Sequence, residues 1–132
     1  MRTVVAFFVL LSLLAACRPP SGSGGPSTSL PDNIKVQIEV GDSPMTGNLP
    51  VSVFILKDNT GVSGATVEVT GNMTHAGMEP VIASAKETEA GLYVAEEFMI
   101  EMPGDTVVTA NITLSDGTKF SVDKAFTVAM TP

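Results

Sequence analysis

The sequence predicts an all-β domain with the architecture of an immunoglobulin-like β-sandwich of about seven strands. Two observations support this prediction. Short segments of alternating apolar and polar residues recur along the chain, and clusters of turn-forming residues separate them. The chain shows no helical period, and it lacks the Cys–Trp–Cys core of antibody domains. We therefore expect the sandwich architecture without membership of the antibody family.

The first half of the domain predicts three strands. In 34–40, Ile and Val alternate with Lys, Gln and Glu, as in a half-buried strand. Gly41–Asp42–Ser43–Pro44 ends this strand, and Pro50–Leu56 is a nearly continuous apolar run, which suits a strand covered on both faces. After a turn at Asp58–Gly61, alternation resumes over 65–70.

The second half predicts four more strands. A short strand over 81–85 is followed by a turn at Ala90–Gly91 and a strand over 92–99. We expect Pro103–Gly104–Asp105 to form a tight turn, with regular alternation beginning at Val108. The hairpin signal Ser115–Asp116–Gly117 then joins the last two strands, expected at 108–114 and 120–128.

The N-terminal segment predicts export and lipid attachment. Residues 1–16 have a basic start and a short apolar run, as in a secretory signal peptide, and the run is too short to span a bilayer as a helix. Leu14–Ala15–Ala16–Cys17 resembles the lipobox of bacterial lipoproteins, which implies cleavage before Cys17 and lipid on that cysteine. The alternative is an ordinary signal peptide that leaves Cys17 as a free thiol.

Residues 17–33, rich in Pro, Gly and Ser, are expected to form a flexible linker to a domain at 34–130. The expected location is the cell envelope, outside the cytoplasm. Because Arg18 rather than Asp follows Cys17, a Gram-negative host would hold the protein in the outer membrane, facing the periplasm. The lipid would make the membrane one partner, and a protein of the envelope is the other partner expected. The net charge of −7 argues against nucleic acid.

One turn carries the residues with the most distinctive chemistry. Met73, His75 and Met78 place the single histidine between two methionines. Thioether and imidazole donors suit Cu(I) better than hard cations. In an extended segment Met73 and His75 project to the same side, and Gly77 permits a reversal that would bring Met78 back toward them. The loop therefore predicts a Cu(I) site, with packing of the methionines in the sandwich as the alternative.

The order of these signals resembles the YtkA-like, or FixH-like, family of exported bacterial β-sandwich domains. The resemblance covers most of 34–128, and its most distinctive part is the Met-His-Gly-Met loop. The segments that carry it are 58–67, 73–80, 90–93, 102–104 and 116–117, with the closing Phe126–Thr127–Val128. It implies an extracytoplasmic domain associated with copper handling.

Catalysis is not expected from this sequence. With one histidine and no cysteine after Cys17, a nucleophile and base would have to be a serine or threonine with His75. No nucleophile elbow or phosphate-binding glycine loop is present. The main alternative to a copper protein is a structural or protein-binding immunoglobulin-like module of the envelope, without metal.

Overall fold

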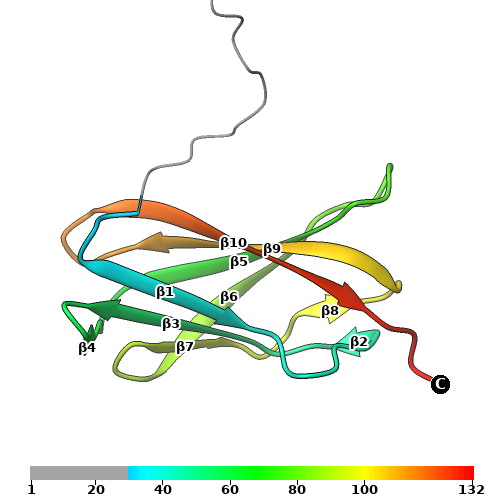
Figure 1. Cartoon of the computed structure of the whole chain (residues 1–132), viewed down its shortest axis with the longest axis horizontal. Coiled ribbons are helices and arrows are strands. Elements are labelled where there is room, and N and C mark those ends of the chain that lie inside the picture. Colours follow the sequence, from blue (N-terminus) through cyan, green and yellow to red (C-terminus); the bar gives the residue numbers. More distant parts are fainter. Residues whose placement is uncertain (1–29) are drawn as a thin grey trace, which may run out of the picture.

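The alternating segments of the sequence form the strands of a two-layered antiparallel sandwich (Figure 1). The computed structural model describes residues 30–132; the expected signal peptide, Cys17 and most of the linker lie outside this range. The strands are β1 (Ile34–Glu39), β2 (Gly47–Asn48), β3 (Val51–Lys57), β4 (Thr60–Gly61), β5 (Thr66–Met73), β6 (Val81–Glu89), β7 (Leu92–Ala95), β8 (Met99–Ile100), β9 (Gly104–Thr113) and β10 (Lys119–Val128).

Strand β6 belongs to both layers. Its first half, Val81–Ala85, pairs with β5, and its second half, from Lys86, pairs with β7 across a bulge between Glu87 and Glu89. One layer thus holds β1, β3 and β7, and the other holds β5, β9 and β10, as Figure 1 shows. A parallel bridge between Met45 and Ala129 also joins the segment after β1 to the end of β10.

The core lies between the layers and follows the period of two. Val67 and Val69 of β5 and the even-numbered residues of β9 from Thr106 to Ile112 point inward and are buried. Phe98, from the opposite layer, lies directly on Gly71, where an added Cβ would collide with its ring. The interior is therefore built mainly from Val, Ile and Ala, with Tyr93, Phe98 and Phe120 filling the larger spaces.

The predicted fold class is confirmed, and the seven expected strands correspond to β1, β3, β5, β6, β7, β9 and β10. The expected strand 92–99 is wrong in its extent, because β7 ends at Ala95 and Met99 belongs to the short β8. The buried positions explain the break. Tyr93 and Ala95 are buried on one parity, whereas Phe98 and Ile100 are buried on the other, so the chain slips by one residue at Glu96–Glu97.

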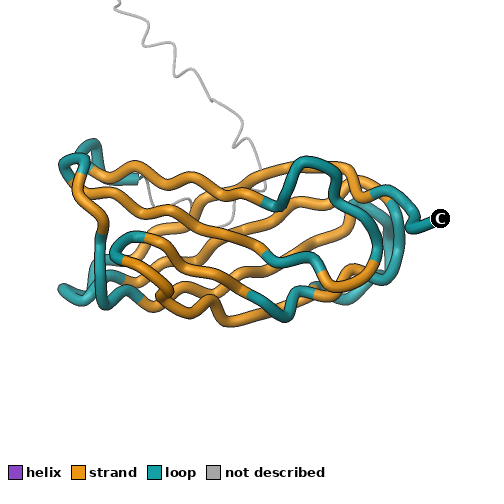
Figure 2. Tube along the Cα trace, turned by 90° about the horizontal axis from the view of Figure 1, so that it is seen from below, coloured by secondary structure: helices purple, strands orange, loops and turns teal. Residues whose placement is uncertain are grey.

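Two further expectations are corrected. Gly104 and Asp105 do not sit in a tight turn but begin β9, where they pair with Val128 and Thr127. The expected coverage of β3 on both faces is also wrong, because its buried residues alternate with half-buried ones. Strands run along the molecule and the loops gather at its two ends, as Figure 2 shows. No helix in residues 30–132 has the length and apolar character needed to cross a membrane.

Candidate functional site

Met73 is the last residue of β5, and the residues after it continue along β9. Met73 pairs with Thr106 of β9, and it is half-buried against the core. The next residue, Thr74, continues the pairing, because its backbone N–H donates to the carbonyl oxygen of Asp105 over 3.1 Å. Pairing therefore continues past the last residue of β5, and His75 comes opposite Gly104.

His75 lies against the backbone of Gly104. A Cβ added to Gly104 would stand 2.7 Å from Cε1 and 3.3 Å from Nδ1 of the imidazole, and the first of these distances is shorter than unbonded atoms approach. Gly104 also has a φ of +143°, a conformation open to glycine and strained for other residues. The absent side chain thus leaves the space that the ring of His75 occupies, while His75 as a whole remains exposed to solvent.

Met78 lies beyond a backbone reversal at Gly77, whose φ is +86°. Gly77 has the positive φ that the sequence prediction required of it. Met78 is 38% exposed, whereas Met73 is half-buried, so the two thioethers of the loop have different environments. The loop that carries His75 and Met78 forms the green projection at the upper right of Figure 1.

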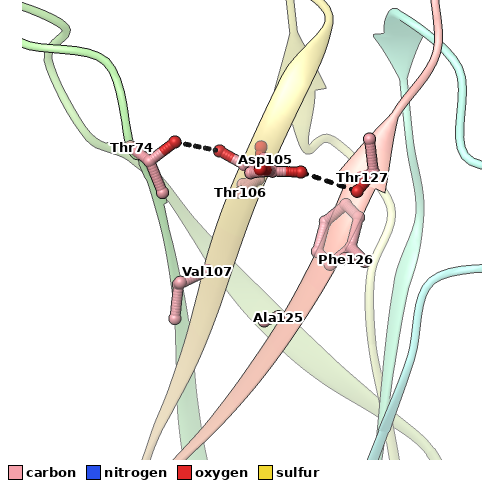
Figure 3. Close-up of a pocket in the computed structure, with 7 residues that line it drawn as sticks. All are labelled: Thr74, Asp105, Thr106, Val107, Ala125, Phe126 and Thr127. Carbon is pink, nitrogen blue, oxygen red and sulfur yellow. Dashed lines mark hydrogen bonds between the residues drawn. The ribbon is translucent and has the colours of Figure 1, made fainter.

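The outer side of the same strands carries a separate, mainly apolar hollow of about 310 Å³ (Figure 3). Thr74, Asp105 and Thr127 line it, and the hydroxyl of Thr127 donates to Oδ1 of Asp105 over 2.7 Å. The hydroxyl of Thr74 donates to the carbonyl oxygen of Asp105 over 3.2 Å. Because successive residues of a strand face opposite sides, this hollow lies across the sheet from Met73 and His75.

A buried hydroxyl lies beside Met73. Among the described residues, Oγ1 of Thr106 is the buried side-chain polar atom that lacks a hydrogen-bond partner. Thr106 is fully buried and pairs with Met73 on one side and Phe126 on the other. An unpartnered hydroxyl of this kind costs about 1–3 kcal/mol. Among the described residues, the buried side-chain polar atom without a hydrogen bond thus lies at the same end of the sandwich as Met73.

The sequence prediction named the donors but missed Gly104. Read as part of a turn, Gly104 gave no sign of contact with His75, because single-sequence patterns do not show which strands pair. Within residues 30–132 there is no group of three or more His, Cys, Asp or Glu side chains that could hold a metal ion. The donors that sequence reasoning selected at this end are the imidazole and the thioethers.

The chain belongs to the YtkA-like family, whose family model matches residues 28–114. This confirms the family that the loop and its flanking strands suggested. The match spans the two strands, β5 and β9, that bring Met73 and His75 beside Gly104. A comparison with curated proteins finds no match.

Two solved structures are similar to this chain. CopC from Methylosinus trichosporium OB3b is 14% identical with a TM-score of 0.51, and the match covers 73% of this chain and 92% of that chain. Murine CRIg is 10% identical with a TM-score of 0.44, and the match covers 74% of this chain and 99% of that chain. The likeness to CopC concerns the fold.

Proposed function

We propose that this protein is a lipid-anchored domain of the bacterial cell envelope that binds or carries Cu(I) through Met73, His75 and Met78. The observation that carries the proposal is the position of the single histidine. His75 lies on the open backbone of Gly104, two residues beyond the half-buried Met73. Its ring is held against the sheet and still reaches solvent, as a site that exchanges an ion requires.

The donor set favours a soft monovalent ion. Two thioethers and one neutral imidazole carry no charge, which suits Cu(I) better than a divalent hard cation. The copper association that the YtkA-like resemblance implies supports the same choice. Binding and transfer, rather than catalysis, are the expected activity, and an extracytoplasmic location follows from the signal peptide and from the lipobox at Cys17.

A competition titration tests the copper site. The processed protein, purified in detergent, is titrated with Cu(I) against a chromophoric chelator under anaerobic conditions. We expect one equivalent to be bound at the loop and His75→Ala to weaken its affinity by about 100-fold or more, because even changes beyond the ligands cost 10–100-fold. Glu79→Gln, in the same loop, is the control for a general effect of the substitution.

The contrary result has a definite meaning. If the chelator removes all Cu(I) from the wild-type loop, or if His75→Ala binds as tightly as the wild type, the loop is not a copper site. The protein would then be a structural or protein-binding module of the envelope. Its contacts would be made through the loops or through the free edges of β1 and β10, which lie at the ends of the strand order.

A further inference from the structure

The hollow on the outer side of β9 and β10 lies next to an open strand edge. β10 ends the strand order of the large sheet, so among the described residues no strand pairs with its far side. The bridge between Met45 and Ala129 covers that side just after β10 ends, where the N–H and the carbonyl oxygen of Ala129 bond to Pro44 and Thr46. Before this bridge, the edge of β10 is open to an added strand.

The hydrogen-bond pattern shows which residues of β10 face this edge. The N–H of Leu114 donates to the carbonyl oxygen of Thr118 over 2.8 Å, and the register of β9 and β10 continues from this pair without a shift. In an antiparallel pair, alternate residues bond to the partner strand, and the residues between them point their N–H and C=O groups away. The backbone groups of Ala125 and Thr127 therefore point to the open edge, as those of Ala129 do.

The side chains of these two residues line the hollow. Thr127 pairs with Asp105, Ala125 pairs with Val107, and all four share the outer side of the sheet. Figure 3 shows Asp105 between Thr74 and Thr127. Val107 and the methyl group of Ala125 supply apolar surface, whereas Asp105 supplies a carboxylate. The hollow thus combines an apolar surface with a negative charge, beside the strand that carries the open edge.

The charge of the hollow favours a basic partner. Oδ1 of Asp105 accepts the hydroxyl of Thr127 over 2.7 Å, which draws the carboxylate toward β10. Lys124 is next to Ala125 in the sequence, but it pairs with the buried Val108, so its side chain leaves the strand on the other face. The whole chain also has a net charge of −7. A positively charged segment is therefore complementary both to the hollow and to the protein as a whole.

A strand added to β10 would bring a side chain to the hollow. Neighbouring strands lie about 4.8 Å apart, so the added strand would stand about 10 Å from β9. A long side chain opposite Ala125 would pass over this small residue and reach the carboxylate of Asp105. Lysine and arginine combine an apolar stem, which suits Val107 and Ala125, with a cationic head that suits Asp105.

We propose that the edge of β10 binds an extended, basic segment of another protein by strand addition, with a lysine or arginine of that segment in the hollow at Asp105. Backbone hydrogen bonds to Ala125 and Thr127 would hold the segment, and the hollow would select the basic side chain. This inference goes beyond the proposed function, because it uses none of the proposed copper ligands and holds whether or not the loop binds copper. A second copy of this chain suits the edge less well, since two chains of net charge −7 repel each other.

A titration with synthetic peptides tests the binding. The processed protein in detergent, labelled with ¹⁵N, is titrated with a short capped peptide of threonines that carries one arginine at its centre, because threonine favours the extended conformation. NMR follows the backbone amides, and hydrogen exchange measures their protection. We expect the amides of Ala125 and Thr127 to shift and to exchange more slowly, because each gains a hydrogen-bond partner.

A matched peptide and matched variants test the role of the basic side chain. A peptide with norleucine in place of arginine keeps an apolar stem and should bind about five-fold more weakly, as the loss of an exposed ion pair predicts. Asp105→Asn should abolish this preference, since asparagine still accepts the Thr127 hydroxyl but carries no charge. Glu68→Gln is the control and should keep the preference, because Glu68 is an exposed residue of the same outer face that pairs with Asn111, away from the hollow.

Ala125→Leu tests the hollow without changing a charge. The leucine side chain would occupy the space above Val107, and because Ala125 is exposed, the fold should persist. We expect this variant to bind the arginine peptide no better than the norleucine peptide.

Three results would overturn the inference. Unchanged exchange of the Ala125 and Thr127 amides at saturating peptide would show that no strand is added. Equal binding of the two peptides by the wild type, or an undiminished preference in Asp105→Asn, would show that the hollow does not select a basic side chain. Slow exchange of these amides without peptide, increasing with protein concentration, would show that the edge pairs with a second copy of this chain instead.

Discussion

At the scale of single residues, the contact between His75 and Gly104 determines where the imidazole lies. Two properties of Gly104 make this contact possible. The missing side chain leaves space for the ring, and glycine adopts the φ of +143° at little energetic cost, whereas other residues would be strained there. A loop histidine that made no contact with the sheet would sample many rotamers. Here the ring lies against the sheet at Gly104.

The first prediction concerns this contact. Gly104→Ala should displace the imidazole, because the new Cβ would stand 2.7 Å from Cε1 of His75. It should also destabilise the fold by about 1–3 kcal/mol through backbone strain. The measurement is the ¹H–¹³C NMR signal of the His75 ring, which is unambiguous because the chain has one histidine. A reduced affinity for Cu(I) should accompany the shift.

Gly117→Ala is the matched control for this prediction. Gly117 also has a positive φ, +88°, but a Cβ there would meet no atom within 4 Å, and it lies in the hairpin at the other end of the sandwich. It should destabilise the fold by a similar amount and leave the ring signal unchanged. If Gly104→Ala also leaves that signal unchanged, the ring does not rest on Gly104 in solution.

At the scale of elements, β6 and β7 hold the segment between β4 and β5 in place. The hydroxyl of Tyr93 donates to the carbonyl oxygen of Val62 over 2.7 Å and accepts from the N–H of Ala65 over 3.1 Å. The backbone N–H of Gly64 donates to Oε2 of Glu87 over 3.1 Å. Burial raises the pKa of Tyr93, so its hydroxyl keeps its proton as a donor far above neutral pH.

The second prediction is a pH dependence at Glu87. Hydrogen bonds from the backbone of Gly64 and then from the Ser63 hydroxyl lower the pKa of Glu87 below its ordinary value. A lowered pKa in the folded state stabilises the fold above the unfolded-state value of about 4.3, and this contribution is lost as the pH falls through the folded-state value. Glu87→Gln should therefore remove part of the stability at pH 6–7 and little at about pH 3.

Urea unfolding of the wild type and Glu87→Gln at a series of pH values measures the difference. Glu89→Gln, an exposed glutamate on the same strand, is the control. Because Glu87 is exposed, the effect should be small and should fall with added salt. A difference between wild type and Glu87→Gln that stays constant from pH 3 to 7 would contradict the assignment.

The elements also show what could be predicted from the sequence. The alternation of apolar and polar residues predicts β1, β9 and β10 from the sequence, because alternate positions in these strands face the core and solvent. The slip at Glu96–Glu97 was not predictable, since Phe98 and Met99 are both apolar and either could face inward. Which strands pair is a long-range property. The contact between His75 and Gly104 therefore became visible only from the pairing of β5 with β9.

At the scale of the whole molecule, the candidate metal-binding residues occupy one end of the sandwich. The loop after β5, the start of β9 and the end of β10 all lie at that end (Figure 1). Residue Leu30, where the described chain begins, leads into β1, and Pro31 accepts a hydrogen bond from the N–H of Ile34. Ile34, the first residue of β1, pairs with Lys57, which is the last residue of β3; Val51 is the first residue of β3 and lies at its other end.

This arrangement matters if the chain is tethered through Cys17. Val51 of β3 follows β2 directly, whereas Lys57, at the other end of β3, leads to the turn at Asp58–Asn59. The tether would therefore enter at the end of the sandwich away from His75. A membrane anchor at Cys17 would leave the loop that carries His75 free to meet soluble partners in the envelope.

The last prediction tests the tether itself. Acylation of Cys17 adds chains whose burial stabilises membrane attachment by about 0.8 kcal/mol per CH₂ group, enough for stable anchoring when several chains are present. In a bacterial host that processes lipoproteins, the full chain should partition into the membrane fraction and be released by detergent but not by high salt. Cys17→Ser should appear in the soluble extracytoplasmic fraction or remain unprocessed.

Mass spectrometry of the purified protein distinguishes lipidated from unmodified protein, because lipid on Cys17 adds the mass of its acyl chains. A wild-type protein found soluble, with an unmodified thiol at Cys17, would assign the leader to an ordinary signal peptide, and the domain would then act as a diffusing protein.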